Sequence, residues 1–250
     1  MGGDFPLSRL RDASNRLGDP EQLRALAEAE GFVYLRGLLP TEPIERLRAR
    51  VLETCARIGW LEPGSDPREA RPRRGVEIGA FDDPAWVQMQ GEIQNTPEFH
   101  DLGGAPRLLE LACQLGGGKA ARTVANTCRV AAPAALHLTT PPHQDAHYVR
   151  RLDRFWTAWI PLGDCPLELG PLAILPGSHR EGLCEHRGER VGGQSAEVAL
   201  DRVWVSGDLI RGDVIFFDRL TLHRACPHRV PDRLRLSADY RYALGVDAAY

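Results

Sequence analysis

A histidine and an aspartate two positions apart, His143 and Asp145, stand out as candidate metal ligands in the stretch PPHQDAHYVR. On a β-strand, residues two apart point to the same face, so both side chains could bind one metal ion while Gln144 faces the other way. His223, at the end of the apolar stretch FFDRLTLH, is the best candidate for a third ligand. Two histidines and one carboxylate on one face of an octahedron leave three positions open, which is the arrangement that non-haem Fe(II) oxygenases use.

The open positions indicate what else such a site would hold. A 2-oxoacid co-substrate would chelate the metal and leave one position for O2, and its far carboxylate would need a buried cation. Arginine suits this role because its planar fork pairs a carboxylate bidentately. The stretch RLRLSADYRY, which begins ten residues after His223, offers Arg233 and Arg235 on the same strand face as Ser237. An inward arginine there would need an anion, because an unpaired buried charge is costly.

The spacing of His143 and Asp145 is weak evidence when taken alone. The chain has 8 histidines and 34 acidic residues, and this composition gives roughly one histidine-x-acid triplet by chance. A second triplet, His179-Arg180-Glu181, follows the turn-forming residues LPGS and need not lie on a strand. His147 could contact a substrate or pack in the core. Structural or surface roles are expected for the remaining histidines, His100, His137, His186 and His228.

The elements that must position these residues change in type along the chain. Asp19-Pro20 and Gly31 are start and stop signals that predict a helix between them, and a short strand, FVYLRGLL, follows. Apolar spacing predicts a second helix from Thr41 and a third over APRLLELACQLGG. Between these helices, residues 62 to 83 are rich in proline, glycine and charge, which predicts an irregular loop.

From about residue 122, short β-forming stretches separated by Pro, Gly and Asp predict a sandwich or barrel. They include AALHLTT, HYVRRL, FWTAWIPL, LAILP, VWVSGDL, DVIFFD and RLRLSADYRY. We therefore expect one domain over 1–250, with a mostly helical part and an irregular loop over 1–121 and a β core over 122–245.

The bulk composition narrows the class of protein. Hydrophobic content of 43% and charged content of 26% are ordinary globular values. A formal charge of −3 offers no general attraction to nucleic acid or to an anionic membrane, so neither partner is expected. The start of the chain lacks the apolar core of a secretory signal, and no stretch is apolar enough to span a bilayer, so we expect a cytoplasmic protein. Six scattered cysteines are expected to be free thiols.

Four groups of motifs together resemble the phytanoyl-CoA dioxygenase-like family of Fe(II)/2-oxoglutarate-dependent oxygenases. They are GFVYLRGLLPTEPIERLRARV, HQDAHY, WTAWIPLGD with GPLAILPGSHR, and GDVIFFDRLTLHRA with RLRLSADYRY. The resemblance runs from about residue 31 to 243 and is interrupted over 60–110. It implies a mainly β fold, a double-stranded β-helix (jelly roll) with flanking helices. It also implies that His143, Asp145 and His223 bind the iron and that Arg233, with Arg235 as the alternative, binds the distal carboxylate of 2-oxoglutarate.

The resemblance also implies a set of residues around the co-substrate. Trp156 is similar to a family tryptophan that lines the pocket, Gln144 lies within the metal triplet, and Cys128 is a further candidate for the lining. Ala225 replaces a small hydroxyl residue that the family often has two positions after the distal histidine. That departure weakens one expected contact with 2-oxoglutarate.

The activity that the resemblance implies is hydroxylation of an unactivated C–H bond of a small molecule, with release of succinate and CO2. Asp145 favours hydroxylation over halogenation, because related halogenases have Gly or Ala there, whereas desaturation, cyclisation and epimerisation use the same ligands. A cupin-like lyase or isomerase would leave Arg233 without an anion, and a non-catalytic jelly-roll module would not require three converging ligands. Arginines in the loop over 62–83, namely Arg68, Arg71, Arg73 and Arg74, indicate an anionic or carrier-linked substrate or a solvated loop.

Overall fold

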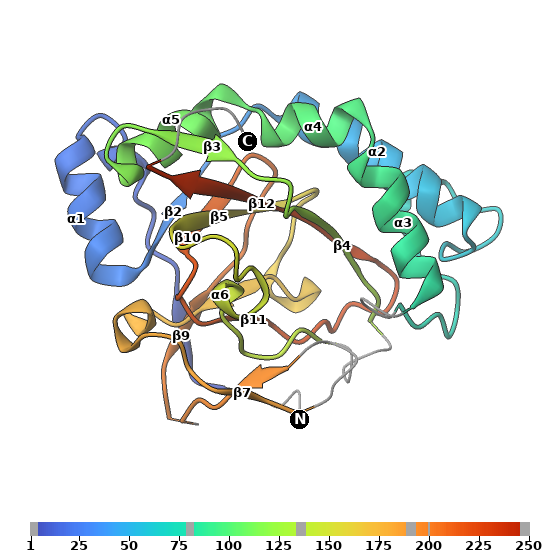
Figure 1. Ribbon diagram of the computed structural model, residues 1–250. Coiled ribbons are helices and arrows are strands. Elements are labelled where there is room, and N and C mark those ends of the chain that lie inside the picture. The colour runs from blue at the N-terminus through green and yellow to red at the C-terminus, as the bar shows by residue number, and fades with distance from the viewer. Residues whose placement is uncertain (1–4, 79–82, 134–138, 189–193, 200, 246–250) are drawn as a thin grey trace.

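The fold is two β-sheets packed face to face, with a layer of helices over the outer face of the larger sheet (Figure 1). The structure is a computed structural model, and it describes residues 5–78, 83–133, 139–188, 194–199 and 201–245. Two facing, mostly antiparallel sheets with external helices are the jelly-roll architecture that the family resemblance implied, and they fit the sandwich or barrel that the short strands predicted.

The larger sheet has the strand order β2-β10-β5-β12-β3, and β4 also pairs with β12. Its strands are β2 (Phe32–Leu35), β10 (Val214–Asp218), β5 (Phe155–Pro161), β12 (Arg235–Leu244), β3 (Ala120–Arg122) and β4 (Thr127–Ala131). Every pairing in this sheet is antiparallel. β5 therefore lies between β10 and β12, near the middle of the sheet.

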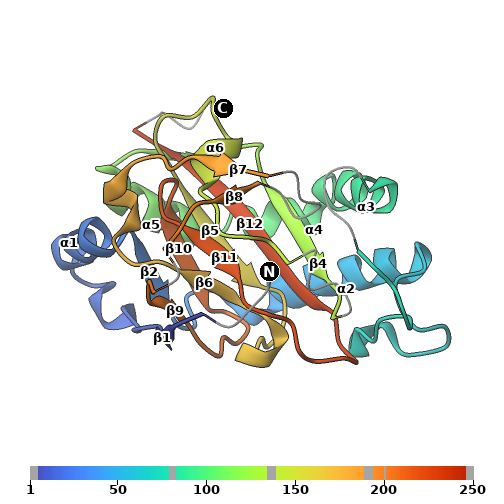
Figure 2. The same ribbon diagram turned by 90° about the horizontal axis from the view of Figure 1, so that it is seen from below.

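The smaller sheet has the order β1-β9-β6-β11. Its strands are β1 (Leu7–Arg9), β9 (Trp204–Ser206), β6 (Leu172–Ile174) and β11 (His223–Ala225). In a separate two-stranded sheet, β7 (His186–Arg187) pairs with β8 (Ser195–Ala196). Only β1 pairs in parallel, with β9, within the described part of this sheet. Seen from below, β6 and β11 lie beside the broad strands β5 and β12 (Figure 2).

Five helices make up most of the outer layer: α1 (Pro20–Glu30), α2 (Thr41–Arg57), α3 (Pro84–Gln94), α4 (Pro97–Gly103) and α5 (Pro106–Gly116). They follow one another around one side of the molecule (Figure 1). The predicted start and stop of α1 are confirmed, since the Asp19 carboxylate accepts from the peptide N–H of Gln22 at 3.1 Å and Gly31 ends the helix at φ 77°. The helices α2 and α5 also match the sequence, whereas α3 and α4 were not predicted.

Residue alternation along β5 separates two cores. Trp156, Ala158 and Ile160 pack in one cluster with the helices, while Trp159 packs in the cluster between the sheets. Thr157 shares the inner face with Trp159, because residues two apart on a strand face the same way. The helix layer covers the outer apolar face, which leaves the inner face available for polar and charged side chains.

The stretch HYVRRL is not a strand, which corrects the prediction. Asp145–Tyr148 forms a single helical turn, α6, and the residues after it are irregular. Of the predicted strand AALHLTT, residues 134–138 lie outside the described residues, and His137 is among them. The irregular loop over 62–83 is confirmed where it is described, because the stretch holds only a short 3-10 turn, Pro67–Glu69, and one isolated bridge.

Two further expectations concern cysteines and membranes. All six cysteines are free thiols, as the sequence predicted. Within the described ranges, no helix combines the length and apolar character that crossing a bilayer requires.

Candidate metal centre

His143 and His223 are direct cross-strand partners. The peptide N–H of each donates to the carbonyl oxygen of the other, at 2.9 and 3.0 Å, in an isolated antiparallel bridge. The two imidazole ring centroids are 4.0 Å apart. Backbone pairing therefore places both rings on one side, where they face the same point.

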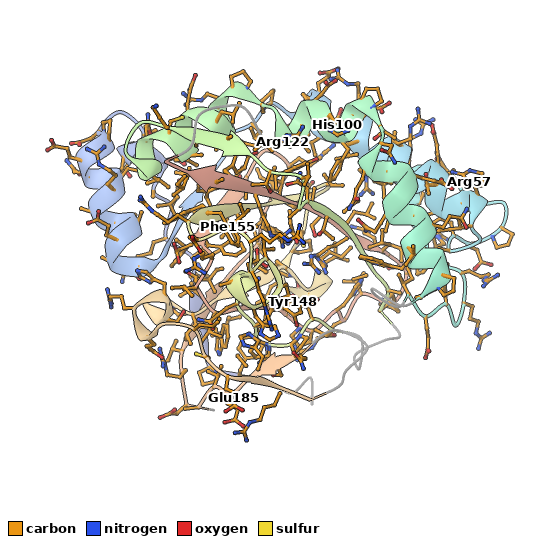
Figure 3. All side chains as sticks on the ribbon, viewed as in Figure 1. Arg57, His100, Arg122, Tyr148, Phe155 and Glu185 are labelled. Carbon is orange, nitrogen blue, oxygen red and sulfur yellow. The ribbon has the colours of Figure 1, made fainter. Side chains whose placement is uncertain are left out.

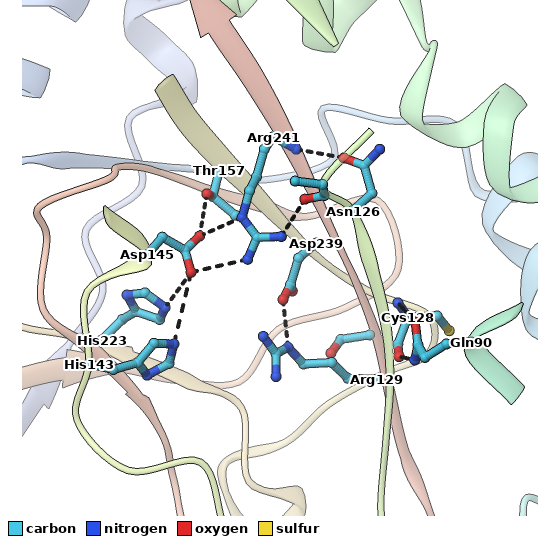
Figure 4. A network of polar contacts seen from close by, with 12 residues as sticks. Gln90, Asn126, Cys128, Arg129, His143, Asp145, Thr157, His223, Asp239 and Arg241 are labelled. Atoms are coloured by element: carbon cyan, nitrogen blue, oxygen red, sulfur yellow. Dashed lines mark hydrogen bonds and ion pairs between the residues drawn. The ribbon is translucent and has the colours of Figure 1, made fainter. Parts of the chain in front are cut away.

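Asp145 completes the group from the first residue of α6. Its Oδ1 atom lies 3.9 Å from Nε2 of His143 and 3.7 Å from Nε2 of His223 (Figure 4). All three side chains are buried, and their ligand atoms lie within 4.8 Å of one another. The predicted triad therefore converges, although helix α6 rather than a strand pleat directs the carboxylate. It is the one such group of metal-ligating side chains in the part of the chain that the structure describes.

The hydrogen bonds of the two histidines fix which ring nitrogen can bind a metal. Nδ1 of His143 lies 2.9 Å from the carbonyl oxygen of Pro141, and Nδ1 of His223 lies 3.0 Å from that of Thr221. A carbonyl only accepts, so each Nδ1 carries the proton and each Nε2 keeps its lone pair. Burial lowers the pKa of both imidazoles, which favours the neutral form that binds metals.

Asp145 is held as a carboxylate by residues that the sequence analysis did not identify. Thr157 Oγ1 donates to Oδ2 at 2.6 Å, and Arg241 donates from Nε to Oδ2 at 2.9 Å and from Nη2 to Oδ1 at 3.1 Å. Burial alone would raise the pKa of Asp145, but the charge and hydrogen bonds of Arg241, together with the neighbouring His223 and His143, outweigh it, so this pKa lies below its usual range. Arg241 shares the strand face of Arg235, a spacing that could have revealed it.

These donors fit a divalent iron. Two neutral imidazole nitrogens and one ionised carboxylate oxygen converge in a buried site, and the cationic group of Arg241 sits behind the carboxylate rather than among the ligand atoms. This is the two-histidine, one-carboxylate set that leaves coordination positions open on non-haem Fe(II). His143, Asp145 and His223 could therefore hold the ion.

An inner cavity adjoins the triad. Its walls include both metal-site histidines and eight other residues: Arg129, Thr140, Trp159, Leu172, Phe217, Ala225, Arg235 and Asp239. Arg235 is 6% exposed and donates from Nη1 to the Ser237 hydroxyl at 2.8 Å. Within the described residues no carboxylate pairs with Arg235, and a buried cation in this state favours a bound anion.

Arg233 does not face this cavity. Its side chain is exposed and lines a separate outer cavity of about 410 Å3, together with other arginines that include Arg48 and Arg211. Strand alternation extended back from Ser237 predicted an inward Arg233, but β12 begins only at Arg235. Arg233 lies before the strand, so the pleat does not direct its side chain inward.

Trp156 and Cys128 also lie away from the cavity. Trp156 stacks on Phe216, with ring centroids 5.6 Å apart, in the cluster that faces the helices, and Cys128 belongs to the same cluster. Trp159 lines the inner cavity instead. Trp156, the predicted tryptophan, lies on the opposite face of β5 from Trp159.

Gln144 is buried, and its side chain is fully engaged by the backbone. Its Nε2 donates to the carbonyl oxygens of Gly182 and Leu220, both at 2.7 Å, and its Oε1 accepts from the peptide N–H of Cys184 at 2.8 Å. These contacts tie two loops to the metal-binding segment. The arrangement leaves Gln144 no free donor for a co-substrate.

His147 and Tyr148 follow the metal ligand Asp145 in the helical turn α6. The ring of His147 stacks on that of His186, with centroids 4.1 Å apart, and its Nε2 lies 2.7 Å from Oε1 of Gln194. The ring of Tyr148 lies against that of His143, with centroids 5.7 Å apart, and Tyr148 is 42% exposed. Figure 3 shows Tyr148 in the central region of the view, whereas Arg57 and Glu185 lie at the periphery.

The second histidine-x-acid triplet has a structural role. It lies in the 3-10 turn Ser178–Glu181, as its turn-forming sequence predicted. Nε2 of His179 lies 3.0 Å from the carbonyl oxygen of Glu28, and Glu181 pairs with Arg202 at 2.8 Å. Neither residue approaches the metal triad.

Comparison with known proteins identifies the family of this chain. Residues 27–235 match the family described as phytanoyl-CoA dioxygenase (PhyH). The chain is 28% identical to a 1-deoxypentalenic acid 11-beta-hydroxylase of Streptomyces exfoliatus, over 94% of this chain and 85% of the relative. It is also 28% identical to the protein of that name from Streptomyces arenae, over 92% and 83%.

Solved structures of similar fold include two that hold the co-substrate. The epimerase SnoN, in complex with Fe3+, alpha ketoglutarate and nogalamycin RO, has a TM-score of 0.64 and 20% identity over 90% of this chain and 84% of that one. EvdO2 from Micromonospora carbonacea var. aurantiaca, complexed with 2-oxoglutarate, has a TM-score of 0.61 and 20% identity over 92% and 93%. Together with the converging triad, these matches show that the chain belongs to the phytanoyl-CoA dioxygenase family of Fe(II)/2-oxoglutarate-dependent oxygenases.

Proposed function

We propose that this oxygenase hydroxylates an unactivated C–H bond of a small molecule in natural-product metabolism. His143, Asp145 and His223 are the iron ligands in this proposal. The observation that carries it is their convergence, with both Nε2 atoms free and the carboxylate ionised, beside a cavity that holds a buried arginine. A non-catalytic module would have no use for that combination of groups.

The proposal assigns the distal carboxylate of 2-oxoglutarate to Arg235 and Ser237. Arg235 is buried, lines the same cavity as the two histidines and lacks a carboxylate partner among the described residues. Its fork can pair a carboxylate bidentately, and the Ser237 hydroxyl is close enough to join that contact. A cupin-like enzyme that does not use 2-oxoglutarate would leave this buried cation without an anion.

Each nearby side chain contributes to the chemistry by positioning or by excluding water. Iron, when bound with 2-oxoglutarate, supplies the power to activate O2 and oxidise a C–H bond, with release of succinate and CO2. Thr157 and Arg241 hold the carboxylate of Asp145 toward the histidines. Trp159 and Phe217 line the inner cavity with apolar surface, which keeps water away from the co-substrate.

Hydroxylation is the reaction favoured by the curated relatives, which are 1-deoxypentalenic acid 11-beta-hydroxylases by name. Structures of similar fold include an epimerase and a carbocyclase, both alpha ketoglutarate dependent by description. The product mass separates these outcomes, because hydroxylation adds one oxygen, ring closure removes two hydrogens and epimerisation changes neither.

The test is formation of succinate from 2-oxoglutarate under air with Fe(II) and 1-deoxypentalenic acid. The wild-type protein is expected to form succinate and an oxygenated product, whereas Asp145→Ala forms neither. Arg107→Gln, a change at an exposed ion pair on α5, serves as the matched control and behaves as wild type. Iron-loaded wild-type protein that forms no more succinate than Asp145→Ala would contradict the proposal.

A further inference from the structure

A second arginine, Arg129, reaches the metal centre from β4 with most of its hydrogen-bonding capacity unused. Its Nε donates to Oδ2 of Asp239 at 2.5 Å, and within the described ranges this is the one hydrogen bond or ion pair of its side chain. It lines the inner cavity with His143 and His223, and Figure 4 shows it extending from β4 toward His143. Because a guanidinium has five N–H donors, both terminal nitrogens of Arg129 remain available.

Asp239 holds Arg129 without satisfying either partner. The side chain of Asp239 is 6% exposed and lines the same cavity, and its Oδ1 atom has no hydrogen-bond partner among the described residues. Its single contact with Nε fixes the direction of the guanidinium and leaves the Nη edge of Arg129 free. An arrangement of this kind positions an arginine for a carboxylate, which pairs with two N–H groups at once.

The charged side chains around the site also carry a net positive charge that one more anion would neutralise. Arg129, Arg235 and Arg241 face the carboxylates of Asp145 and Asp239, so positive charge exceeds negative by one. A divalent iron and doubly ionised 2-oxoglutarate cancel each other and leave that excess unchanged. A bound monocarboxylate would neutralise it.

Arg129 and Arg235 differ in their access to solvent, and this difference separates their roles. Arg235 is 6% exposed and bonded to Ser237, as suits a co-substrate held deep between the sheets. The side chain of Arg129 is 22% exposed, so a molecule arriving from solvent can reach it. Arg129 is therefore placed for the molecule that is oxidised rather than for 2-oxoglutarate.

We propose that Arg129 binds the carboxylate of the primary substrate and that the substrate is a small carboxylic acid. This inference rests on the proposed function and narrows its substrate class. The names of the two Streptomyces relatives describe an acid as their substrate, which agrees with it. Asp239 is the positioning residue that orients Arg129.

The test compares an acid with its uncharged ester. Isothermal titration of the Mn(II)·2-oxoglutarate form, which binds without turnover, measures Kd for 1-deoxypentalenic acid and its methyl ester, and for decanoic acid and methyl decanoate. Wild-type protein is expected to bind at least one acid roughly tenfold more tightly than its ester. Arg129→Gln reduces the affinity for that acid to the level of its ester and changes Kd for 2-oxoglutarate less than twofold.

Matched variants separate a specific contact from a general loss of folding. Arg129→Lys keeps the charge without the fork and retains part of the preference for the acid. Arg107→Gln, on the surface of α5, retains all of it. Asp239→Asn weakens acid binding and keeps the preference, since Arg129 remains but is less well oriented.

Three results would overturn the inference. The first is wild-type protein that binds neither acid more tightly than its ester. The second is Arg129→Gln protein that keeps the preference for the acid. The third is a tenfold loss of 2-oxoglutarate affinity in Arg129→Gln, which would assign Arg129 to the co-substrate. The acid and ester comparison needs no variant, so a variant that fails to fold does not prevent the test. Wild-type protein that binds no 2-oxoglutarate would instead contradict the proposed function itself.

Discussion

At the scale of single residues, the surroundings of Asp145 determine whether the triad can hold a metal. One oxygen faces the two histidines, while the other accepts from Thr157 at 2.6 Å and from Arg241 at 2.9 Å. Groups behind a ligand orient it, and removing them typically costs 10–100-fold in metal affinity or activity. Thr157 is the more informative of the two to change, since its substitution leaves the charge of Arg241 in place.

Thr157→Val removes the hydroxyl and keeps the shape of the side chain. We expect the affinity for Fe(II) to fall roughly tenfold, because Oδ2 of Asp145 loses its shortest hydrogen bond and the carboxylate can rotate. Anaerobic titration of Fe(II) into the metal-free protein measures the change. Thr54→Val, at a buried threonine of α2, is the control, and equal affinities in the two variants would contradict this account.

The sequence predicted the triad because the spacing of His143 and Asp145, the position of His223 and the family resemblance agreed, although the spacing alone was weak evidence. It did not separate Arg233 from Arg235, or Trp156 from Trp159, since the inward face depends on where each strand begins and on which neighbours cover it. Those facts are set by tertiary packing. Arg129 lies in the stretch RTVANTCRV, which carries no signal that a carboxylate on β12 would hold its side chain.

At the scale of elements, the segment around α6 brings the ligands together. His143 pairs with His223 in a bridge, and Asp145 then begins a helical turn that directs its carboxylate back toward both rings. Gln144, between the two ligands, accepts from Cys184 and donates to Gly182 and Leu220. The geometry of the triad therefore depends on loops that are distant in sequence.

Gln144→Leu tests this role against a role in co-substrate binding. The substitution leaves two carbonyls and one peptide N–H without partners in the interior, so we expect the free energy of unfolding to fall by about 2 kcal/mol or more. Urea unfolding measures it, with Gln88→Leu on the exposed face of α3 as the control. A loss of 2-oxoglutarate affinity with unchanged stability would contradict the structural role.

Elements were predicted well where local signals and packing agree. The helix α1 has its cap and its terminal glycine, and β5, β10 and β12 carry dense β-forming residues. The stretch HYVRRL also contains β-forming residues, but contacts of Gln144 and His147 with distant loops favour a helical turn. The helices α3 and α4 begin at Asp83-Pro84 and Thr96-Pro97, the same cap-and-proline signal as α1.

At the scale of the whole molecule, burial of neutral histidines links stability to pH. Burial and the charge of Arg235 lower the pKa of His228 to about 4. Its Nε2 lies 2.9 Å from the carbonyl oxygen of Arg233, and its Nδ1 accepts from the peptide N–H of Val230, so the neutral ring is the form that fits. Burial lowers the pKa of His186 as well.

These shifts predict that the metal-free protein loses stability in acid. An unfolded histidine takes up its proton near pH 6.5, whereas the pKa of folded His228 is about 4, so protonation favours the unfolded chain. The free energy of unfolding should therefore fall as pH decreases from about 6.5 toward 4. Urea unfolding at pH values across that range measures it, and His228→Gln should reduce the slope. Stability that is constant or rises toward the lower pH would refute the prediction.

The most direct test of the whole account is an anaerobic titration of Fe(II) and 2-oxoglutarate into the metal-free protein, followed by the visible charge-transfer band of an iron-chelated 2-oxoacid. The account predicts that wild-type protein and Arg233→Ala develop the band at the same 2-oxoglutarate concentration. It predicts no band for His223→Ala and at least a tenfold higher 2-oxoglutarate requirement for Arg235→Ala. Wild-type protein that binds iron without the band, or Arg233→Ala protein that behaves as expected for Arg235→Ala, would contradict it.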